Sequence, residues 1–297
     1  MRKLSNNSSG QALLLVLLSM SVVLTIVLSI LARSTLDIGI SSRSEESVRA
    51  FSAAEAGIEQ ALVAGPLIGS LDNNATFNAS VTGFSSGVSE FVLPSNLYSG
   101  ESTTVWFVSH NGDGSLTCAD GACFTGDQIQ VCWGKEGTSA GLSLTPAIEV
   151  SIIYLTSAGD YSTAQIAREV SDPNSDRRGS NSFSSPDGGT CQVNGQNFAF
   201  KKTIDFGNGG LKILPAAVYK QPNGLQLARI SLLYNTDMGH PVSIIGPSGS
   251  LFPVQGSVID SSGSSGSSTR RVEVTRGFRE LPGIFENAAI SGGGISL

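Results

Sequence analysis

Charged residues are scarce in this chain, and basic ones especially. Only 14% of the 297 residues are charged, and 18 Lys and Arg face 24 Asp and Glu. Phosphate recognition needs a clustered surplus of positive charge, so we expect no nucleic-acid partner. The basic pairs that do occur, such as Arg177-Arg178 and Lys201-Lys202, are interpreted as solvated strand faces. The chain also lacks the Glu, Lys and Ala content of a coiled-coil rod.

Histidine is nearly absent, and the usual catalytic motifs are missing. His110 and His240 are the only side chains whose ordinary pKa suits general-base chemistry near neutral pH. The sequence contains no glycine-rich phosphate loop, HExxH motif or nucleophile elbow. We therefore predict no catalytic residue, no enzyme activity and no cofactor.

One segment has the start of a calcium-loop pattern. Asn111, Asp113 and Ser115 alternate as ligands do in an EF-hand, but the sixth and twelfth positions are Leu116 and Ala122, where Gly and Glu are required. The favoured interpretation is a plain turn and no metal. The alternative is an irregular calcium site that includes Asp113, Asp120 or Asp127.

Cysteine is limited to four residues, all beyond the apolar N-terminal segment: Cys118, Cys123, Cys132 and Cys191. An even number on the translocated side of a membrane suggests disulfides, and four cysteines allow three pairings. We favour Cys118–Cys123 with Cys132–Cys191, while a pairing of Cys123 with Cys191 stays open. A zinc site is disfavoured because no CxxC spacing occurs.

The most prominent feature that is present is one long apolar segment. Residues 12–32 contain no charge, glycine or proline. As a helix they span roughly 30 Å, the thickness of the hydrocarbon core of a bilayer. The segment is too long for an ordinary secretory signal, and no A-x-A site follows it. Because Arg2 and Lys3 precede it, we predict a transmembrane helix over 12–32 with its N-terminus in the cytoplasm.

The helical pattern continues beyond this segment. Apolar residues recur three or four positions apart, and Gly65-Pro66 is a natural helix stop. We predict one helix from about Ala12 to Ala64, apolar all round in its first half and amphipathic in its second. The expected apolar stripe consists of Leu36, Ile40, Val48, Phe51, Ala54, Ile58, Ala61 and Leu62.

Residues 10–62 resemble the N-terminal region of type IV pilins, specifically the PilX-like minor pilins. The matching pieces are a short basic leader ending in Gly10, the sequence GQALLLVLLSMSVVLTIVL from that glycine, and FSAAEAGIEQAL from Phe51. The resemblance implies that residues 1–10 are a leader peptide, that prepilin peptidase cuts between Gly10 and Gln11, and that the new amine is methylated. Major pilins carry Glu at the fifth mature position. Here that position is Leu15, a departure that fits the PilX-like group.

The same resemblance implies partners and a location. Residues 11–64 would bind other pilin subunits, and the prepilin peptidase and the inner-membrane pilus assembly machinery would act on the chain. The protein would be a single-pass cytoplasmic membrane protein that later joins an extracellular filament, as a subunit of a type IV pilus or a related filament. A solvated helix face is favoured for Glu55 and Glu59 over pairing with neighbouring subunits. The alternative function is a permanently membrane-anchored surface binding protein with a β-rich ectodomain.

From residue 65 to 297 the signals are those of β structure. We predict an α+β fold, in which the long helix is followed by a large, mainly antiparallel β head. The resemblance implies that the head packs on the second half of the helix. Alternating or β-branched runs, separated by turn-rich stretches, occupy residues 75–83, 103–109, 128–134, 147–155, 198–206, 225–235, 240–246 and 269–278.

Two expectations concern the organisation of this head. It is larger than one four-stranded sheet needs, so two sheets or long inserted loops should absorb the excess. If the head is divided, the boundary is expected in the polar stretch near residues 171–190. Residues 261–268 contain only Ser and Gly, and we predict that they form a mobile surface loop between two strands.

Overall fold

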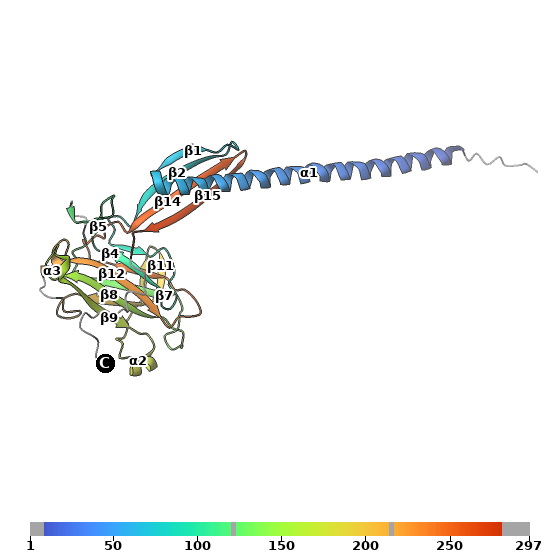
Figure 1. The fold of residues 1–297 in the computed structure, drawn as a ribbon. Coiled ribbons are helices and arrows are strands. Elements are labelled where there is room, and N and C mark those ends of the chain that lie inside the picture. The colour runs from blue at the N-terminus through green and yellow to red at the C-terminus, as the bar shows by residue number, and fades with distance from the viewer. Residues whose placement is uncertain (1–8, 120–122, 214–216, 281–297) are drawn as a thin grey trace, which may run out of the picture. The chain divides into compact units, whose positions relative to one another are not determined.

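The computed structural model describes residues 9–119, 123–213 and 217–280, with the backbone alone at 9–11. It has the predicted α+β layout, a long N-terminal helix followed by a mostly antiparallel β region (Figure 1). The chain forms two compact units. The first comprises Met1–Val81 and Ile259–Val274, and the second comprises Thr82–Val258 and Thr275–Leu297.

Helix α1 (Ser9–Ala64) begins the first unit and is unbroken. It ends where glycine permits a left-handed residue, because Gly65 has a φ of +82° and its amide donates to Ala61 O at 3.0 Å. Pro66 follows and cannot extend the helix. The prediction of a single helix to Ala64 is therefore confirmed.

A four-stranded sheet packs against the last third of α1 within the same unit. One helix face, which carries Ala50, Ala53, Ala54, Ile58 and Ala61, is buried against it. The sheet contributes aliphatic residues and one aromatic ring, that of Phe77, to this core. Its strand order is β1 (Leu67–Ser70), β2 (Thr76–Phe84), β14 (Gly256–Ser265) and β15 (Ser268–Gly277).

Glycine allows the helix and the sheet to approach closely. A Cβ on Gly263 would lie 2.0 Å from Ala50 O and 2.4 Å from Ala54 N, so strand backbone touches helix backbone at this point. A Cβ on Gly57 would lie 2.9 Å from the Phe77 ring, which fills the space that the missing side chain leaves. Small residues are thus required on both partners.

The prediction of a mobile Ser/Gly loop at 261–268 is wrong. Most of this segment belongs to β14, where Ser261 is fully buried. Beyond the turn at Gly266, Ser267 donates to Glu46 through its backbone amide at 2.9 Å and its hydroxyl at 3.0 Å. These bonds lower the pKa of Glu46 below its usual range. Ordering the segment costs conformational entropy. Its close packing against α1, where only small side chains fit, offsets that cost.

The second unit is a β-sandwich with two sheets. One hydrophobic cluster contains inward-facing residues from both, including Val131 and Trp133 from one sheet and Val150 and Ile230 from the other. The five-stranded sheet has the order β10 (Cys191–Val193), β11 (Gln196–Asp205), β7 (Gln128–Lys135), β13 (Val242–Ile245) and β3 (Glu90–Val92). The four-stranded sheet has the order β4 (Ser102–Trp106), β12 (Leu225–Leu233), β8 (Ala147–Leu155) and β9 (Ala164–Ser171).

Short elements complete this unit. They are the hairpin β5 (Ser109–His110) and β6 (Leu116–Thr117), the one-turn 3-10 helix η2 (Tyr161–Thr163), and the helices α2 (Ser175–Asn181) and α3 (Ala217–Lys220). All eight predicted β runs coincide with strands. The sandwich provides the two sheets expected in the head, in addition to the separate sheet that packs on α1.

The predicted boundary near residues 171–190 is wrong. The segment lies inside the second unit and is fixed there by Asp172, whose side chain is fully buried. This carboxylate accepts from Arg177 Nε at 3.0 Å, from Asn174 N at 2.9 Å and from Asn181 Nδ2 at 2.9 Å. Arg177 also stacks over the Tyr234 ring at 4.0 Å. The polar residues that suggested a linker therefore form a hydrogen-bonded network.

Candidate functional site

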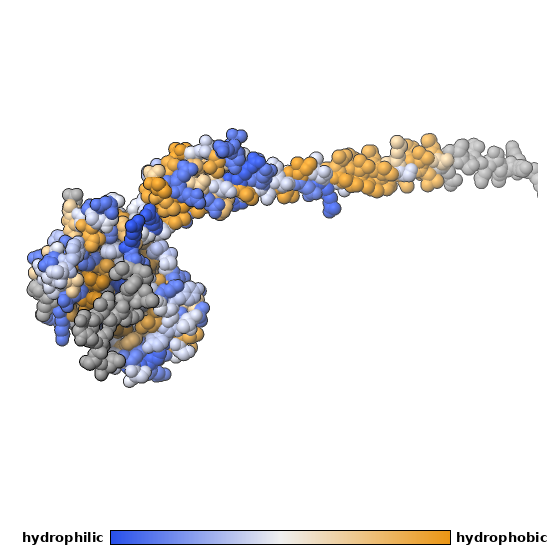
Figure 2. Space-filling view, viewed as in Figure 1, coloured by the Kyte–Doolittle hydropathy of each residue, from blue (hydrophilic) through white to orange (hydrophobic). Residues whose placement is uncertain are grey.

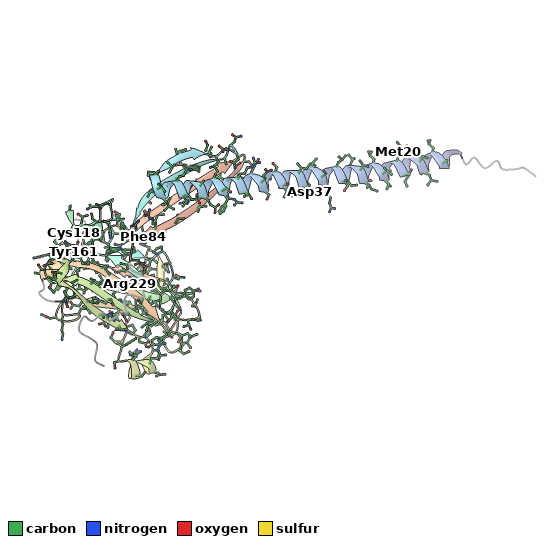
Figure 3. The ribbon with its side chains drawn as sticks, viewed as in Figure 1. Met20, Asp37, Phe84, Cys118, Tyr161 and Arg229 are labelled. Atoms are coloured by element: carbon green, nitrogen blue, oxygen red, sulfur yellow. A yellow bond between two sulfur atoms is a disulfide. The ribbon has the colours of Figure 1, made fainter. Side chains whose placement is uncertain are left out.

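The first half of α1 presents a continuous apolar surface. Every large apolar side chain from Leu13 to Leu31 is 46–70% exposed. This surface forms an orange band along the helix in Figure 2, and Met20 projects from it in Figure 3. By length and composition this helix could cross a membrane. Moving each such side chain from water to an apolar environment gains roughly 1.5–3 kcal/mol, so this surface needs lipid or other apolar helices around it.

Three of the hydroxyl groups within this half are internally bonded. Ser19, Ser21 and Thr25 each donate to a backbone carbonyl three residues earlier, at 2.8–2.9 Å. A hydroxyl bonded in this way carries a smaller penalty in an apolar environment. The apolar character of residues 12–32 is therefore not interrupted by their side chains.

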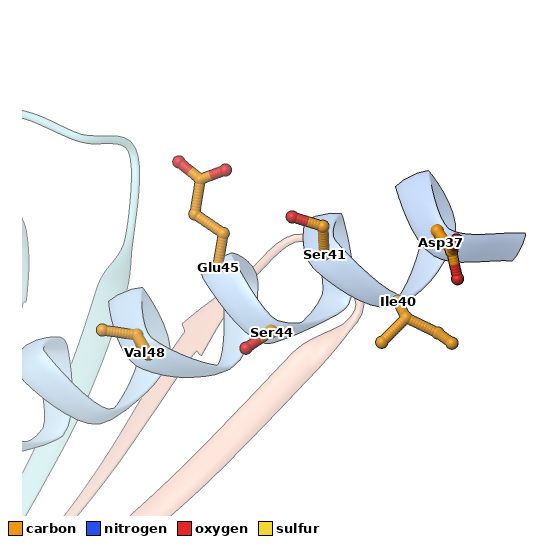
Figure 4. Close-up of a pocket in the computed structure, with 6 residues that line it drawn as sticks. All are labelled: Asp37, Ile40, Ser41, Ser44, Glu45 and Val48. Carbon is orange, nitrogen blue, oxygen red and sulfur yellow. The ribbon is translucent and has the colours of Figure 1, made fainter. Parts of the chain in front are cut away.

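A more polar segment of the helix follows the apolar half. Its charges include Asp37 and the pair Glu45–Arg49, four residues apart. The depression in Figure 4 runs along successive turns here and is lined by Asp37, Ile40, Ser41, Ser44, Glu45 and Val48. Because it is open to solvent and its lining is largely exposed, we assign it no small-molecule ligand.

The predicted apolar stripe divides in two. Ala54, Ile58 and Ala61 face the sheet as expected, but Val48 and Phe51 are 63% and 46% exposed. Leu62 is also exposed on that second side, and Leu36 and Ile40 are exposed earlier on the helix. The stripe was wrong as a single buried face because residues three and four apart drift around a long helix. Val48 and Phe51 keep this second face exposed.

The other helix residues for which the sequence predicts a role lie as follows. Glu55 and Glu59 lie on the exposed side of α1. Gly10 and Gln11 belong to the first turns of the helix, while residues 1–8 of the predicted leader lie outside the described residues. Leu15 is 66% exposed within the apolar surface.

All four cysteines are paired. Cys118 is bonded to Cys123 and Cys132 to Cys191, the pairing that the sequence favoured. The second disulfide connects β7 to β10 across β11, on the outer face of the five-stranded sheet, where both sulfurs are buried with Val193 and Phe198. These bonds stabilise the β-sandwich rather than form a reactive site.

Asp113, the first candidate calcium ligand, lies in the β5–β6 hairpin turn. Its Oδ1 accepts from the Ser115 amide at 2.9 Å and the Ser115 hydroxyl at 2.6 Å, which lowers its pKa below the usual range. Asp120 lies outside the described residues. No group of three or more His, Cys, Asp and Glu side chains that could hold a metal occurs in the part of the chain that the structure describes.

The two histidines are held by packing and by a backbone amide. His110 stacks on Phe278 with 3.7 Å between ring centroids and meets Trp106 edge-on, and burial lowers its pKa. His240 is only 3% exposed, and its Nδ1 accepts from the Lys135 amide at 3.1 Å.

The protein is expected to lose stability as the pH falls below about 6.5. Burial lowers the pKa of His240 from its ordinary value of 6.5, Asp237 opposes this and Lys135 adds to it. A folded-state pKa below the unfolded value means that the stabilisation is complete above pH 6.5 and declines as the pH falls toward the folded-state pKa. Denaturant unfolding at pH 7.5 and 5.5 measures this difference. His240→Asn, whose side-chain oxygen can accept from Lys135 without titrating, should show a smaller difference. An equal difference in both proteins would rule out His240 as the cause.

Comparison with known proteins finds that no family model, no curated protein and no solved structure matches this chain.

Proposed function

We propose that this chain is a PilX-like minor pilin, a structural subunit of a type IV pilus or a related filament. Prepilin peptidase would cut after Gly10, and the processed chain would enter the filament through its apolar helix. The head would then mediate assembly or adhesion at the filament surface. The mechanism is packing rather than catalysis.

The observation that carries this proposal is the exposed apolar half of an unbroken helix. Its last third is fixed by a sheet of the same chain, so the first half cannot fold back onto that sheet. An apolar cylinder of this length is stable in lipid, and outside lipid it requires other apolar helices. A filament subunit meets both requirements in turn, first as a membrane precursor and then in a bundle.

The leader gives the transfer from membrane to filament a physical basis. Arg2 and Lys3 precede the apolar segment and would anchor its end at the cytoplasmic face, because moving such charges through the bilayer is costly. Cleavage after Gly10 would remove both charges. The processed helix could then leave the bilayer along its axis.

The N-terminus of the mature protein tests this proposal. When the chain is produced in cells that contain a prepilin peptidase, mass spectrometry of the exported protein should find Gln11 as the first residue, with an N-methyl group. Gly10→Val should leave the leader in place, whereas the matched neighbour Ser9→Ala should be processed normally. A wild-type chain that keeps Met1 under these conditions would contradict the proposal and favour a permanently anchored surface protein.

A further inference from the structure

The second unit contains a cavity with aromatic walls. Its volume is about 230 Å³, and every described residue that lines it belongs to this unit. Phe91 and Leu93 in its lining are buried, whereas Thr275 and Glu280 are exposed. The cavity therefore has an apolar inner end and a rim that solvent reaches. Sites for drug-sized ligands usually measure roughly 300–1,000 Å³, so this cavity suits a smaller organic group.

Four aromatic rings line the cavity as two nearly perpendicular pairs. The rings of Phe84 and Phe91 meet edge-to-face, with 5.7 Å between their centroids and 82° between their planes. His110 lies against Phe278 with 11° between the planes and meets Trp106 at 87°. The planes of Trp106 and Phe278 are therefore also close to perpendicular. Rings arranged in this way can enclose one small group from more than one side.

The backbone at Trp106 is held by the protein itself. Gln255 Oε1 accepts from Trp106 N at 2.7 Å, and Gln255 Nε2 donates to Trp106 O at 2.9 Å and to Pro253 O at 2.8 Å. Gln255 also lines the cavity, and its side-chain amide is occupied by these bonds. Because this wall is fixed in advance, a ligand would not have to order it on binding.

The charges around the cavity favour a cation. Glu280 contributes a carboxylate, and none of the described residues in the lining is Lys, Arg or His. Arg276 and Arg279 are exposed outside the lining. His110, behind the Phe278 ring, adds no positive charge at neutral pH because burial lowers its pKa. The faces of aromatic rings are negative and attract cations, and the carboxylate adds to this attraction.

Thr104 provides a second, independent sign of a ligand. It lines the cavity, and its Oγ1 is buried without a hydrogen-bond partner among the described residues. A buried hydroxyl oxygen in this state is unfavourable, and a ligand that donates a hydrogen bond to it would remove the cost. The site therefore suits a cation that also carries a hydroxyl group.

We propose that this cavity binds a small organic cation of the choline type, with its quaternary ammonium group among the four rings and near Glu280, and its hydroxyl group at Thr104 Oγ1. Recognition of quaternary ammonium groups is a typical use of aromatic cages. A phospholipid headgroup is disfavoured as the source of this group, because no basic residue in the described lining is placed to bind its phosphate. The inference goes beyond the proposed function and does not depend on it.

Titration of the full-length chain with choline, in a detergent without an ammonium group, tests the proposal. The chain has two tryptophans, and Trp133 is fully buried away from the lining. Choline should shift the NMR signal of the Trp106 indole N–H and leave that of Trp133 in place. The uncharged analogue of choline, with carbon in place of nitrogen, should bind roughly tenfold more weakly. A Trp106 signal that does not move, equal affinity for the analogue, or tighter binding of phosphocholine than of choline would overturn the proposal.

Two substitutions test the two contacts separately. Glu280→Gln should weaken choline binding roughly threefold, while the matched control Glu136→Gln, at an exposed position of the same unit outside the lining, should not change it. Thr104→Val should weaken choline binding roughly threefold but leave the binding of tetramethylammonium, which has no hydroxyl group, unchanged. Unchanged choline affinity in Glu280→Gln, or equal losses for both cations in Thr104→Val, would contradict the proposed contacts.

Discussion

Gly263→Ala is expected to destabilise the first unit by about 3 kcal/mol, near the top of the range for overpacked cores. The added methyl group would lie 2.0 Å from Ala50 O and 2.4 Å from Ala54 N. Both atoms belong to the backbone of α1, so no side chain can rotate away. The helix and the sheet must separate, and the contacts of Phe77 and Ile58 weaken with them.

Hydrogen exchange measures this effect locally, which matters because a chain with two units need not unfold in one step. Amides of residues 76–81 should exchange roughly a hundredfold faster in Gly263→Ala, while those of β12 keep their rates. The matched control is Gly277→Ala, which meets no atom within 4 Å and should be neutral or slightly stabilising. Similar exchange rates in the two variants would contradict the close contact between β14 and α1.

Asp172→Asn is expected to destabilise the second unit by about 3–5 kcal/mol, the usual effect of leaving a buried charge without its partner. The Asp172 side chain is fully buried, and its Oδ1 accepts from Arg177 Nη2 at 2.7 Å. An amide in its place directs its own N–H groups toward these donors. The matched control Asp176→Asn, at an exposed position of the same segment, should change stability by less than about 1 kcal/mol.

The same carboxylate predicts acid sensitivity. Burial alone would raise the pKa of Asp172, but the hydrogen bonds from Arg177, Asn174 and Asn181 outweigh it and hold the pKa below 3.8. The stabilisation is therefore complete above about pH 4 and declines as the pH falls from there toward the folded-state pKa. Denaturant unfolding of the second unit at pH 5 and pH 3 measures the loss, which should be smaller in Asp172→Asn than in the wild type. A loss of the same size in this variant would mean that another group titrates.

The long helix could be predicted from the sequence because its signals are local. Residues 12–32 have one composition throughout, and Gly65-Pro66 ends the helix whatever surrounds it. The eight strand runs were also found, since alternation along a strand reflects burial on one face. β9 was missed because Arg168 and Glu169 occupy its middle and no alternating pattern stands out.

The parts that failed depend on specific contacts that the composition of a segment does not reveal. Ser261 and Gly263 look like loop residues until α1 is placed beside them, where only small side chains fit. Asp172 and Arg177 look like a polar linker until their hydrogen bonds are counted. The composition of a segment reflects the average structural preference of its residue types. At Gly263 this preference is overridden by contact with α1, whose Ala50 lies more than 200 residues earlier in the chain.

For the candidate site, the sequence predicted the exposed apolar half but not the side of the second half that stays uncovered. Phe51 and Ala54 are both apolar and three residues apart, yet only Ala54 fits the close approach of the sheet. The size of the side chain, rather than its polarity, decides which face is buried. That distinction required the structure of the sheet that packs there.

The most direct test of the central claim is to identify what surrounds residues 12–32 before and after assembly. A photo-cross-linking amino acid at Leu24, which is 59% exposed, would be activated in the membrane fraction and in sheared surface filaments. The account predicts lipid adducts in the membrane and links to the N-terminal helices of other subunits in the filaments. Lipid adducts alone, with no chain recovered from sheared filaments, would contradict it.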